Sequence, residues 1–114
     1  MAATLHRMSE QRAVVRDNPE ERQFEVLVEG VRAGLARYVR RPGRLVFVHT
    51  EVDPAYSGQG VGSVLAAGAL DAARAEGVRV LPLCPFIEGF IAKHPEYADL
   101  VDTELLARFD APLS

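Results

Sequence analysis

The chain has 114 residues, of which 48% are hydrophobic and 25% charged, and a formal net charge of −3. This is the composition of a folded domain, and the small negative charge excludes a basic surface that would coat nucleic acid. The single cysteine excludes an intramolecular disulfide and a cysteine-based zinc site, and it fits a reducing cytoplasm. No apolar run approaches membrane-spanning length. We therefore expect a cytoplasmic domain without a metal, a nucleic-acid partner or a membrane partner.

Residues 1–11 show no hydrophobic periodicity, which predicts a loose N-terminal extension ahead of a single domain over residues 12–110. Residues 13–16 are a short apolar run that predicts a strand. Asp17-Asn18-Pro19 follows as a strong turn signal, because Asp and Asn bond to nearby backbone and proline presets its own φ.

Two alternating runs, residues 22–28 and 31–41, flank the turn pair Glu29-Gly30 and predict a β-hairpin. Alternation in a strand sends apolar side chains to one face and polar side chains to the other, so we expect half-buried strands. The predicted apolar face holds Phe24, Val26, Val28, Val31, Ala33, Leu35 and Val39, and the predicted polar face holds Gln23, Glu25, Arg32, Tyr38 and Arg40.

Residues 45–52 begin apolar on both faces, which predicts a strand in the middle of the sheet. The run becomes polar at its end, where His49 and Glu51 share one face and Thr50 takes the other. The far end of this strand is therefore the first candidate for a site.

The second half of the chain predicts a strand–helix–strand unit. Residues 61–76 form an Ala-rich helical pattern that ends at Gly77, a suitable C-cap. Residues 78–83 read as a strand that should run parallel to residues 45–52 through a right-handed crossover. Pro82 should end this pairing, because proline has no N–H to donate.

Two short helices complete the expected elements, one over residues 86–93 and one over residues 104–109, the second capped by Thr103. A turn over residues 95–101 separates them, since Pro95 limits the first helix. The elements together predict an α/β (α+β) fold, with a mostly antiparallel sheet, one parallel strand pair, and helices packed on the sheet.

The stretch Tyr56-Ser57-Gly58-Gln59-Gly60-Val61-Gly62-Ser63 joins the strand at 45–52 to the helix at 61–76. A glycine-rich turn at a helix N-terminus binds anions, because unpaired N–H groups and the positive end of the helix dipole point at the ligand. The Walker pattern would need a lysine after Gly62, and the dinucleotide fingerprint has a different glycine spacing. Both familiar phosphate-binding loops therefore fit poorly.

Ser57-Gly58-Gln59-Gly60-Val61-Gly62 resembles the pyrophosphate-binding motif of the GNAT superfamily of N-acetyltransferases, Gln/Arg-x-x-Gly-x-Gly/Ala, although Ser57 stands where Gln or Arg is usual. The flanking segments resemble the small YjdJ-type subfamily of GNAT-like proteins, over a span from about Val15 to Val101. Those segments are His49-Thr50-Glu51-Val52, Leu81-Pro82-Leu83-Cys84-Pro85-Phe86 and Lys93-His94-Pro95-Glu96-Tyr97.

The resemblance implies a minimal acetyl-CoA-binding domain that acts as an N-acetyltransferase and lacks the helical pair and the last β-hairpin of larger relatives. It also implies that the parallel strands splay apart to admit the pantetheine arm of CoA. The residues implied to hold the cofactor are Thr50, Val52, Ser57, Gly58, Gln59, Gly60, Val61, Gly62, Ser63, Phe86 and Lys93.

The polar candidates for catalysis at the strand ends are His49, Glu51 and Cys84. The resemblance puts Cys84 nearest the chemistry, where it could accept the acetyl group or donate a proton to the leaving thiolate. His49 could activate the Cys84 thiol, and Glu51 could deprotonate the incoming amine. Simpler roles stay open at this point: Cys84 as a small buried hydrophobe, His49 as a cap for strand-end carbonyls, Glu51 and Lys93 as solvated charges, and Phe86 as a core residue.

Two alternatives to an acetyltransferase remain on the sequence alone. One is a non-catalytic acyl-CoA-binding or protein-interaction module, and the other is a nucleotide-binding protein of a different kind. For the enzyme, the acceptor amine belongs either to a small molecule or to a protein lysine or N-terminus, and the sequence does not separate these cases.

Overall fold

The computed structural model describes residues 13–110, so the extension predicted for residues 1–11 lies outside the described part. Five strands form one sheet in the order β1-β2-β3-β4-β5. Neighbouring strands are antiparallel from β1 to β4, and β5 runs parallel to β4. This confirms the predicted mixed fold. The strands are β1 (Ala13–Asn18), β2 (Gln23–Val28), β3 (Val31–Arg41), β4 (Arg44–Val52) and β5 (Arg79–Pro82).

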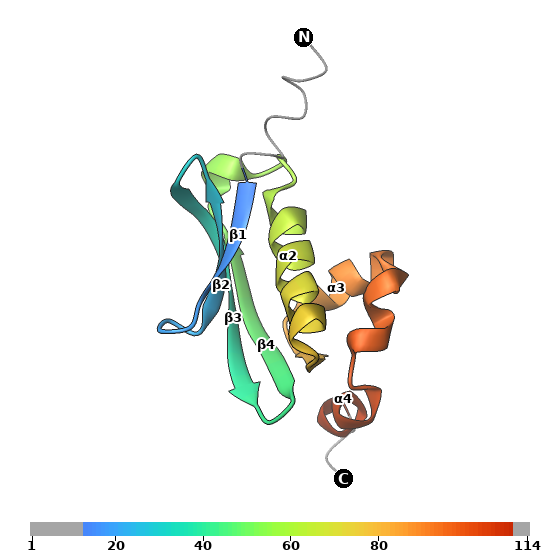
Figure 1. Cartoon of the computed structure of the whole chain (residues 1–114). Coiled ribbons are helices and arrows are strands. Elements are labelled where there is room, and N and C mark those ends of the chain that lie inside the picture. Colours follow the sequence, from blue (N-terminus) through green and yellow to red (C-terminus); the bar gives the residue numbers. More distant parts are fainter. Residues whose placement is uncertain (1–12, 111–114) are drawn as a thin grey trace.

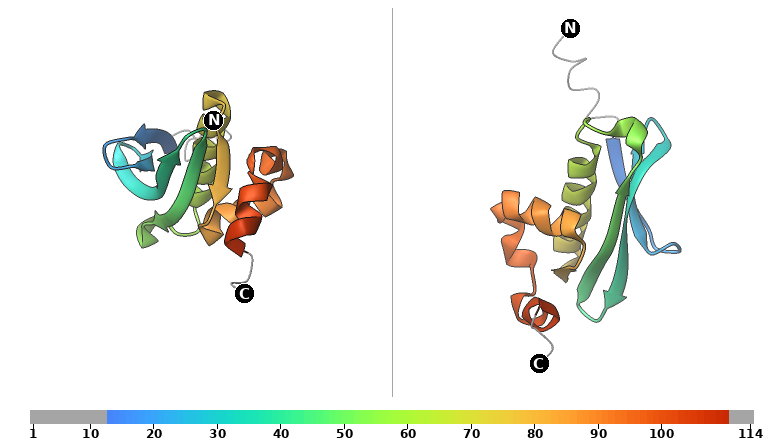
Figure 2. Two further views of the ribbon diagram at one scale, coloured as in Figure 1. Left: turned by 90° about the horizontal axis from the view of Figure 1, so that it is seen from below. Right: turned by 180° about the vertical axis from the view of Figure 1, so that it is seen from behind.

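The helices lie on one side of the sheet. Figures 1 and 2 show α2 against one sheet face and the later helices beyond α2, so the opposite face carries no helix within the described range. The helical elements are α2 (Val61–Glu76), α3 (Pro85–Lys93) and α4 (Thr103–Asp110), with 3-10 turns η1 (Pro54–Tyr56) and η2 (Pro95–Leu100).

Several predicted element ends were wrong: the strand predicted over residues 78–83 is shorter, Arg79–Pro82, and two further differences have a clear cause. Strand β1 continues to Asn18, because its ladder with β2 extends to the pair Asn18 and Gln23. The cap of α4 is Asp102 rather than Thr103: Asp102 Oδ1 accepts the N–H of Leu105 at 3.1 Å, and its carbonyl accepts the N–H of Leu106 at 2.9 Å. The carboxylate of Asp102, one residue before the predicted cap, therefore accepts a hydrogen bond from a free N–H group in the first turn of this helix.

The predicted inward face of β3 was also wrong in part. The β2–β3 register shifts between Val26 and Leu27, which leaves Ala33 as an extra residue in β3. Such a β-bulge changes which residues point inward. Ala36 and Tyr38 consequently join the core beside Phe24 and Val26, whereas Leu35 lies opposite Glu25 and Glu51 on the other face.

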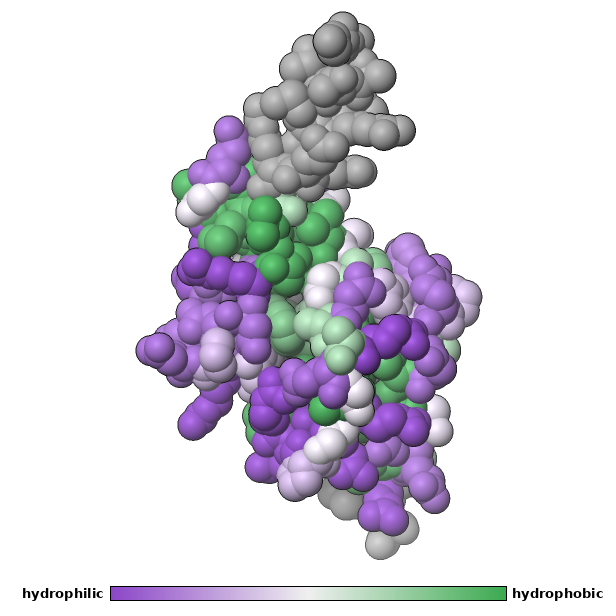
Figure 3. Space-filling model, viewed as in Figure 1, coloured by the Kyte–Doolittle hydropathy of each residue, from purple (hydrophilic) through white to green (hydrophobic). Residues whose placement is uncertain are grey.

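The core lies between the sheet and α2, where Phe47 and Leu45 of β4 pack with Leu65 and Leu70 and are fully buried. Small residues bring α2 very close to the sheet, as a Cβ added at Gly68 would lie 2.6 Å from Val15 of β1. Figure 3 shows a largely hydrophilic surface, with hydrophobic residues gathered at the end of the molecule where β1 begins.

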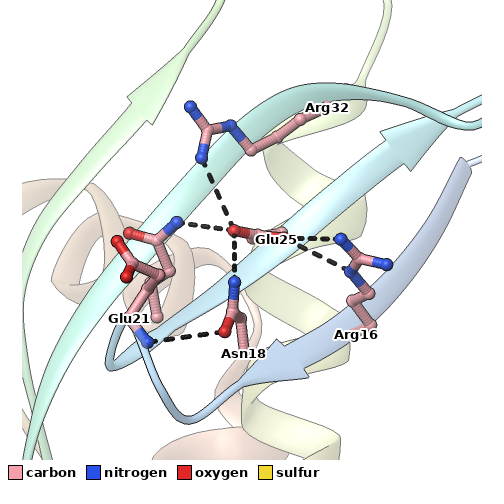
Figure 4. A network of polar contacts seen from close by, with 6 residues as sticks. Arg16, Asn18, Glu21, Glu25 and Arg32 are labelled. Atoms are coloured by element: carbon pink, nitrogen blue, oxygen red, sulfur yellow. Dashed lines mark hydrogen bonds and ion pairs between the residues drawn. The ribbon is translucent and has the colours of Figure 1, made fainter.

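Gln23 and Glu25 were expected on a solvated polar face, and this was wrong: they are 1% and 3% exposed. Glu25 accepts hydrogen bonds from Gln23 at 2.6 Å, Asn18 at 3.1 Å and Arg16 at 3.2 Å, and Arg32 lies at 3.5 Å (Figure 4). The hydrogen bond from Gln23 is the main cause that lowers the pKa of Glu25, against the opposing effect of burial. This network lets a carboxylate be buried on a sheet face that no helix of residues 13–110 covers.

Candidate active site

The parallel strands separate at the middle of β4. Pairing of β4 with β5 runs from Arg44 opposite Arg79 to Phe47 opposite Pro82 and stops there, as the missing N–H of proline predicts. The N–H groups of Leu83 and Cys84 both donate to the carbonyl of Phe47, each at 3.0 Å. Beyond Phe47 the backbone of β4 therefore has no β5 partner, and the strands open into a split.

A second bulge lies in β4 at this split. Arg37 of β3 pairs with His49 and Tyr38 pairs with Phe47, which leaves Val48 unpaired. Val48 and Leu83 are large hydrophobic residues that remain exposed beside the split. No feature of the sequence predicted this bulge, because any residue can occupy the extra position.

Thr50 and Cys84 meet on the side of the split that faces α2. Thr50 Oγ1 lies 3.0 Å from Cys84 Sγ, and either atom can be the donor. Cys84 is 3% exposed and is the N-cap of α3, which begins with Pro85. Thr50 is paired with Ala36, whose side chain belongs to the core face of the sheet. The sequence indicated both residues for the site but not their contact.

His49 and Glu51 lie on the opposite face of the sheet. His49 Nε2 is 2.9 Å from Glu51 Oε2, and both side chains are exposed to solvent. They share a face because they are two residues apart in a strand, as predicted. The structure therefore pairs His49 with Glu51 and pairs Cys84 with Thr50, and within residues 13–110 the imidazole makes no hydrogen bond to the thiol.

The glycine-rich loop leads from η1 into α2. Gly58 has φ of 79° and Gly60, the N-cap of α2, has φ of 76°, a left-handed conformation that glycine adopts without strain. No side chain caps this helix, and the first intrahelical bond runs from the N–H of Val64 to the carbonyl of Gly60 at 3.1 Å. The N–H groups of residues 61–63 are thus free to bind a ligand.

A cavity of about 240 Å³ lies over this loop. Val52, at the end of β4, and Phe86, at the start of α3, complete its wall, and Phe86 is 42% exposed. A Cβ added at Gly62 would lie 2.6 Å from the Phe86 ring, so a side chain at this position would require the ring to move. The loop residues that line the cavity are Tyr56, Ser57, Gly58, Gly60, Val61, Gly62 and Ser63.

A second cavity of about 280 Å³ shares Ser63 and Phe86 with the first and extends along α3 to Lys93 and His94. The structure thus brings the predicted residue Lys93 to the same surface as the loop. Gln59 does not line the loop cavity, and its side chain donates instead to the carbonyl of Ala55 at 3.4 Å.

A third cavity of about 280 Å³ lies on the other sheet face, beside Glu51. It is lined by Arg32, Ala33, Gly34, Leu35, Glu51, Val52, Asp53 and Pro54. Val52 borders both this cavity and the loop cavity, so hollows on the two faces meet at the end of β4.

No three His, Cys, Asp or Glu side chains in the described residues come together in a way that could hold a metal ion. None of the helices in this range is long and apolar enough to cross a membrane.

Comparison with known proteins gives a family match over most of the domain. The sequence profile of the GCN5-related N-acetyl-transferase family matches residues 23–100. No curated protein sequence shows a significant match.

Among solved structures, the solution structure of a GCN5-like protein from Staphylococcus aureus superposes with a TM-score of 0.61 at 22% identity. The match covers 79% of this chain and 88% of that one, and it supports the fold. The ribosomal-protein-S18-alanine N-acetyltransferase from Escherichia coli matches with a TM-score of 0.48 at 21% identity, over 70% of this chain and 47% of that one.

Proposed function

Because the chain belongs to the GCN5-related N-acetyltransferase family, we propose that it transfers an acetyl group from acetyl-CoA to an amine. The observation that carries this proposal is the glycine-lined cavity at the start of α2, which opens beside the split between β4 and β5. The segments around the split also resemble the small YjdJ-type subfamily, and we propose that the chain is a member of it.

The loop fits a pyrophosphate group in its chemistry. Free N–H groups at residues 61–63 and the positive end of the α2 dipole provide donors without a competing side-chain cap. Residues Ser57–Ser63 would hold the pyrophosphate of CoA, and Ser57 supplies a hydroxyl where relatives most often have a longer side chain. Lys93, whose exposed side chain lines the adjoining cavity, would pair with the remaining phosphate of CoA.

The split between the strands fits the pantetheine arm. The backbone of β4 at Thr50 and Val52 has no β5 partner and can hydrogen-bond an amide-containing chain. The exposed hydrophobic residues Val48, Leu83 and Phe86 provide apolar contacts beside it.

When bound, acetyl-CoA supplies an acetyl group that is activated as a thioester. Glu51 and His49 provide the proton acceptor for the amine, because their 2.9 Å contact lets the imidazole and the carboxylate share the proton. On the opposite side of β4, the Cys84 thiol beside the Thr50 hydroxyl is the proposed proton donor for the departing thiolate.

We propose direct transfer to the amine rather than through an acetyl group on Cys84. A cysteine nucleophile needs a base or a cation beside it, and the hydrogen-bond partner of Cys84 is the hydroxyl of Thr50. Intact-mass measurement after incubation with acetyl-CoA should show no acetyl group on wild-type protein. Acetylation that is lost in Cys84→Ala would contradict direct transfer and leave the cofactor assignment intact.

A thermal-shift titration tests the cofactor site. Acetyl-CoA should raise the melting temperature, and ATP and NAD should raise it less. Gly62→Ala should weaken acetyl-CoA binding by roughly tenfold, about 1.4 kcal/mol, because its Cβ lies 2.6 Å from the Phe86 ring. Gly30→Ala, in the turn between β2 and β3, is the control for a general loss of stability, since a Cβ there meets nothing within 4 Å but the φ of 82° disfavours alanine. A melting temperature that millimolar acetyl-CoA does not move would sink the proposal.

A non-catalytic acyl-CoA-binding module is the second candidate. It is favoured by the open sheet face beside His49 and Glu51, which no helix of the described residues covers to form an acceptor pocket (Figure 2). The enzyme hypothesis expects Glu51→Gln to lower acetyl transfer strongly while acetyl-CoA still shifts the melting temperature. Acetyl-CoA binding without transfer to any amine in a broad panel would favour the module.

A further inference from the structure

Arg37 occupies the position next to the proton-accepting pair on the sheet face turned away from α2. The β3–β4 register places Arg37 opposite His49, and Leu35 opposite Glu51. Side chains of directly opposed residues in an antiparallel pair lie close enough to act on one ligand. The guanidinium of Arg37 is thus one strand away from the groups that would receive the amine.

Of the arginines on this face, two near the site are already engaged, and Arg41 lies at the far end of β3, opposite Arg44. Arg16 and Arg32 both turn toward Glu25 and pair with it at 3.2 and 3.5 Å (Figure 4). Arg37 is exposed and makes no hydrogen bond or ion pair within residues 13–110. It is therefore a cation that can bind an anionic ligand without first breaking an ion pair with another side chain.

A hollow adjoining these residues sets the size of that ligand. The cavity measures about 280 Å³ and is lined by Leu35 and Glu51, while the neighbouring opposed pair, Arg37 and His49, lies outside its lining. Its charged residues are Glu51, Asp53 and Arg32, of which Asp53 accepts the N–H of Ala55 at 2.9 Å and Arg32 faces Glu25. The volume admits a small molecule and is at the low end for ligand sites, which argues against a folded partner.

The charges select among small amines. An alkylamine or polyamine arrives as a cation and would be drawn to Glu51 and Asp53 of the hollow, but it would leave Arg37 without an anion. An amine that also carries an anionic group satisfies both, because its anion can take paired hydrogen bonds from the guanidinium while its amine faces Glu51 and His49. Resting on the proposed acetyltransferase function, we propose that the acceptor is a small amino carboxylate whose carboxylate binds Arg37.

The test compares acceptors that differ only in the anion. Acetyl transfer is measured with β-alanine and 4-aminobutyrate, with their amides, and with 2-aminoethylphosphonate to separate a carboxylate from a phosphorus acid. The carboxylates should have a KM at least tenfold lower than their amides. Arg37→Met should raise the KM for the carboxylates on the order of tenfold to a hundredfold, so that the difference from the amides disappears.

Arg41→Met is the matched control, because Arg41 lies exposed on the same strand, opposite Arg44 rather than the site. It should leave every KM unchanged. Equal kcat/KM values for carboxylate and amide, or a preference that survives Arg37→Met, would overturn the assignment. A phosphonate that outperforms both carboxylates would overturn the carboxylate in favour of a phosphorus acid.

If no amine is acetylated, the same probes are titrated into CoA-saturated protein and followed by NMR chemical shifts. Carboxylate binding that Arg37→Met abolishes and Arg41→Met does not would support the ligand assignment even then. Absence of such binding would overturn it. The proposed function fails separately, through the thermal shift with acetyl-CoA, so the two failures are distinguishable.

Discussion

Glu25 is buried because neighbouring side chains donate hydrogen bonds to it, although strand alternation predicts an exposed position. It is 3% exposed on a sheet face that carries no helix in the described part of the chain, and Gln23, Asn18 and Arg16 donate hydrogen bonds to its carboxylate. Burying a charge is costly unless donors replace water, and here they do. The same network occupies Arg16 and leaves Arg37 available.

We predict that Glu25→Gln lowers the free energy of unfolding by about 2 kcal/mol at pH 7, because it removes charged hydrogen bonds from a buried group. The folded-state pKa of Glu25 is lowered, so its ionised form stabilises the fold above the unfolded value of 4.5 and loses that effect as pH falls through the folded value. Urea unfolding should show the difference from wild type shrinking below pH 4.5. Glu20→Gln, in the exposed β1–β2 turn, is the control, and an equal effect there would contradict the prediction.

At the scale of elements, α2 is held against the edge strand β1 by a close contact at glycine. A Cβ at Gly68 would lie 2.6 Å from Val15 Cβ, and Val15 packs against the core. Helix propensity alone would favour alanine at this position. The contact with β1 is therefore what requires glycine here, and it sets the distance between the helix and the sheet.

We predict that Gly68→Ala destabilises the protein by about 1–3 kcal/mol through overpacking, despite the helix-propensity gain. The double variant Gly68→Ala with Val15→Ala should recover part of this loss, since the added methyl group then has room. Thermal or urea unfolding measures both. A Gly68→Ala protein that is more stable than wild type would show that the helix shifts freely on the strand.

At the scale of the whole molecule, the segment after α3 is tied to α2 and to β4 by polar contacts. Tyr97 donates to Asp71 at 2.8 Å, Arg74 bonds Asp99 at 2.8 and 2.9 Å, and Arg44 bonds Asp102 at 2.8 Å. These contacts join η2 to α2, the helix that follows the loop, and they join the residue before α4 to β4. Burial, followed by the hydrogen bond to Asp71, raises the pKa of Tyr97 to about 12.

We predict that Tyr97 makes stability fall in alkaline solution. The folded state keeps the phenol protonated to about pH 12, whereas the unfolded chain releases the proton near 10.0, so stability is full below pH 10 and falls as pH rises toward 12. Tyr97→Phe should flatten this slope and cost about 1 kcal/mol at pH 8. Tyr56→Phe, whose hydroxyl has no hydrogen-bond partner within residues 13–110, should keep the wild-type slope; parallel curves for all three proteins would refute the prediction.

Local chemistry along the chain was sufficient to predict most elements and the glycine-rich turn that leads into α2. The strands follow from period-two alternation, α2 from its long apolar pattern, and the end of the β4–β5 pairing from the missing N–H of Pro82. Gly58 and Gly60 are left-handed in the structure, which agrees with the glycine pattern that singled out the loop. These features depend on residues close together in sequence.

Tertiary structure alone decided which side chains meet. The bulges at Ala33 and Val48 moved Leu35 away from the core, brought Tyr38 into it, and placed Arg37 beside His49. The partner of Cys84 is Thr50, 34 residues away, and no periodicity reports a contact of that separation. The physical reason is that strand register is set by packing across the sheet. One extra residue in a strand reverses the sheet face to which each later side chain of that strand points.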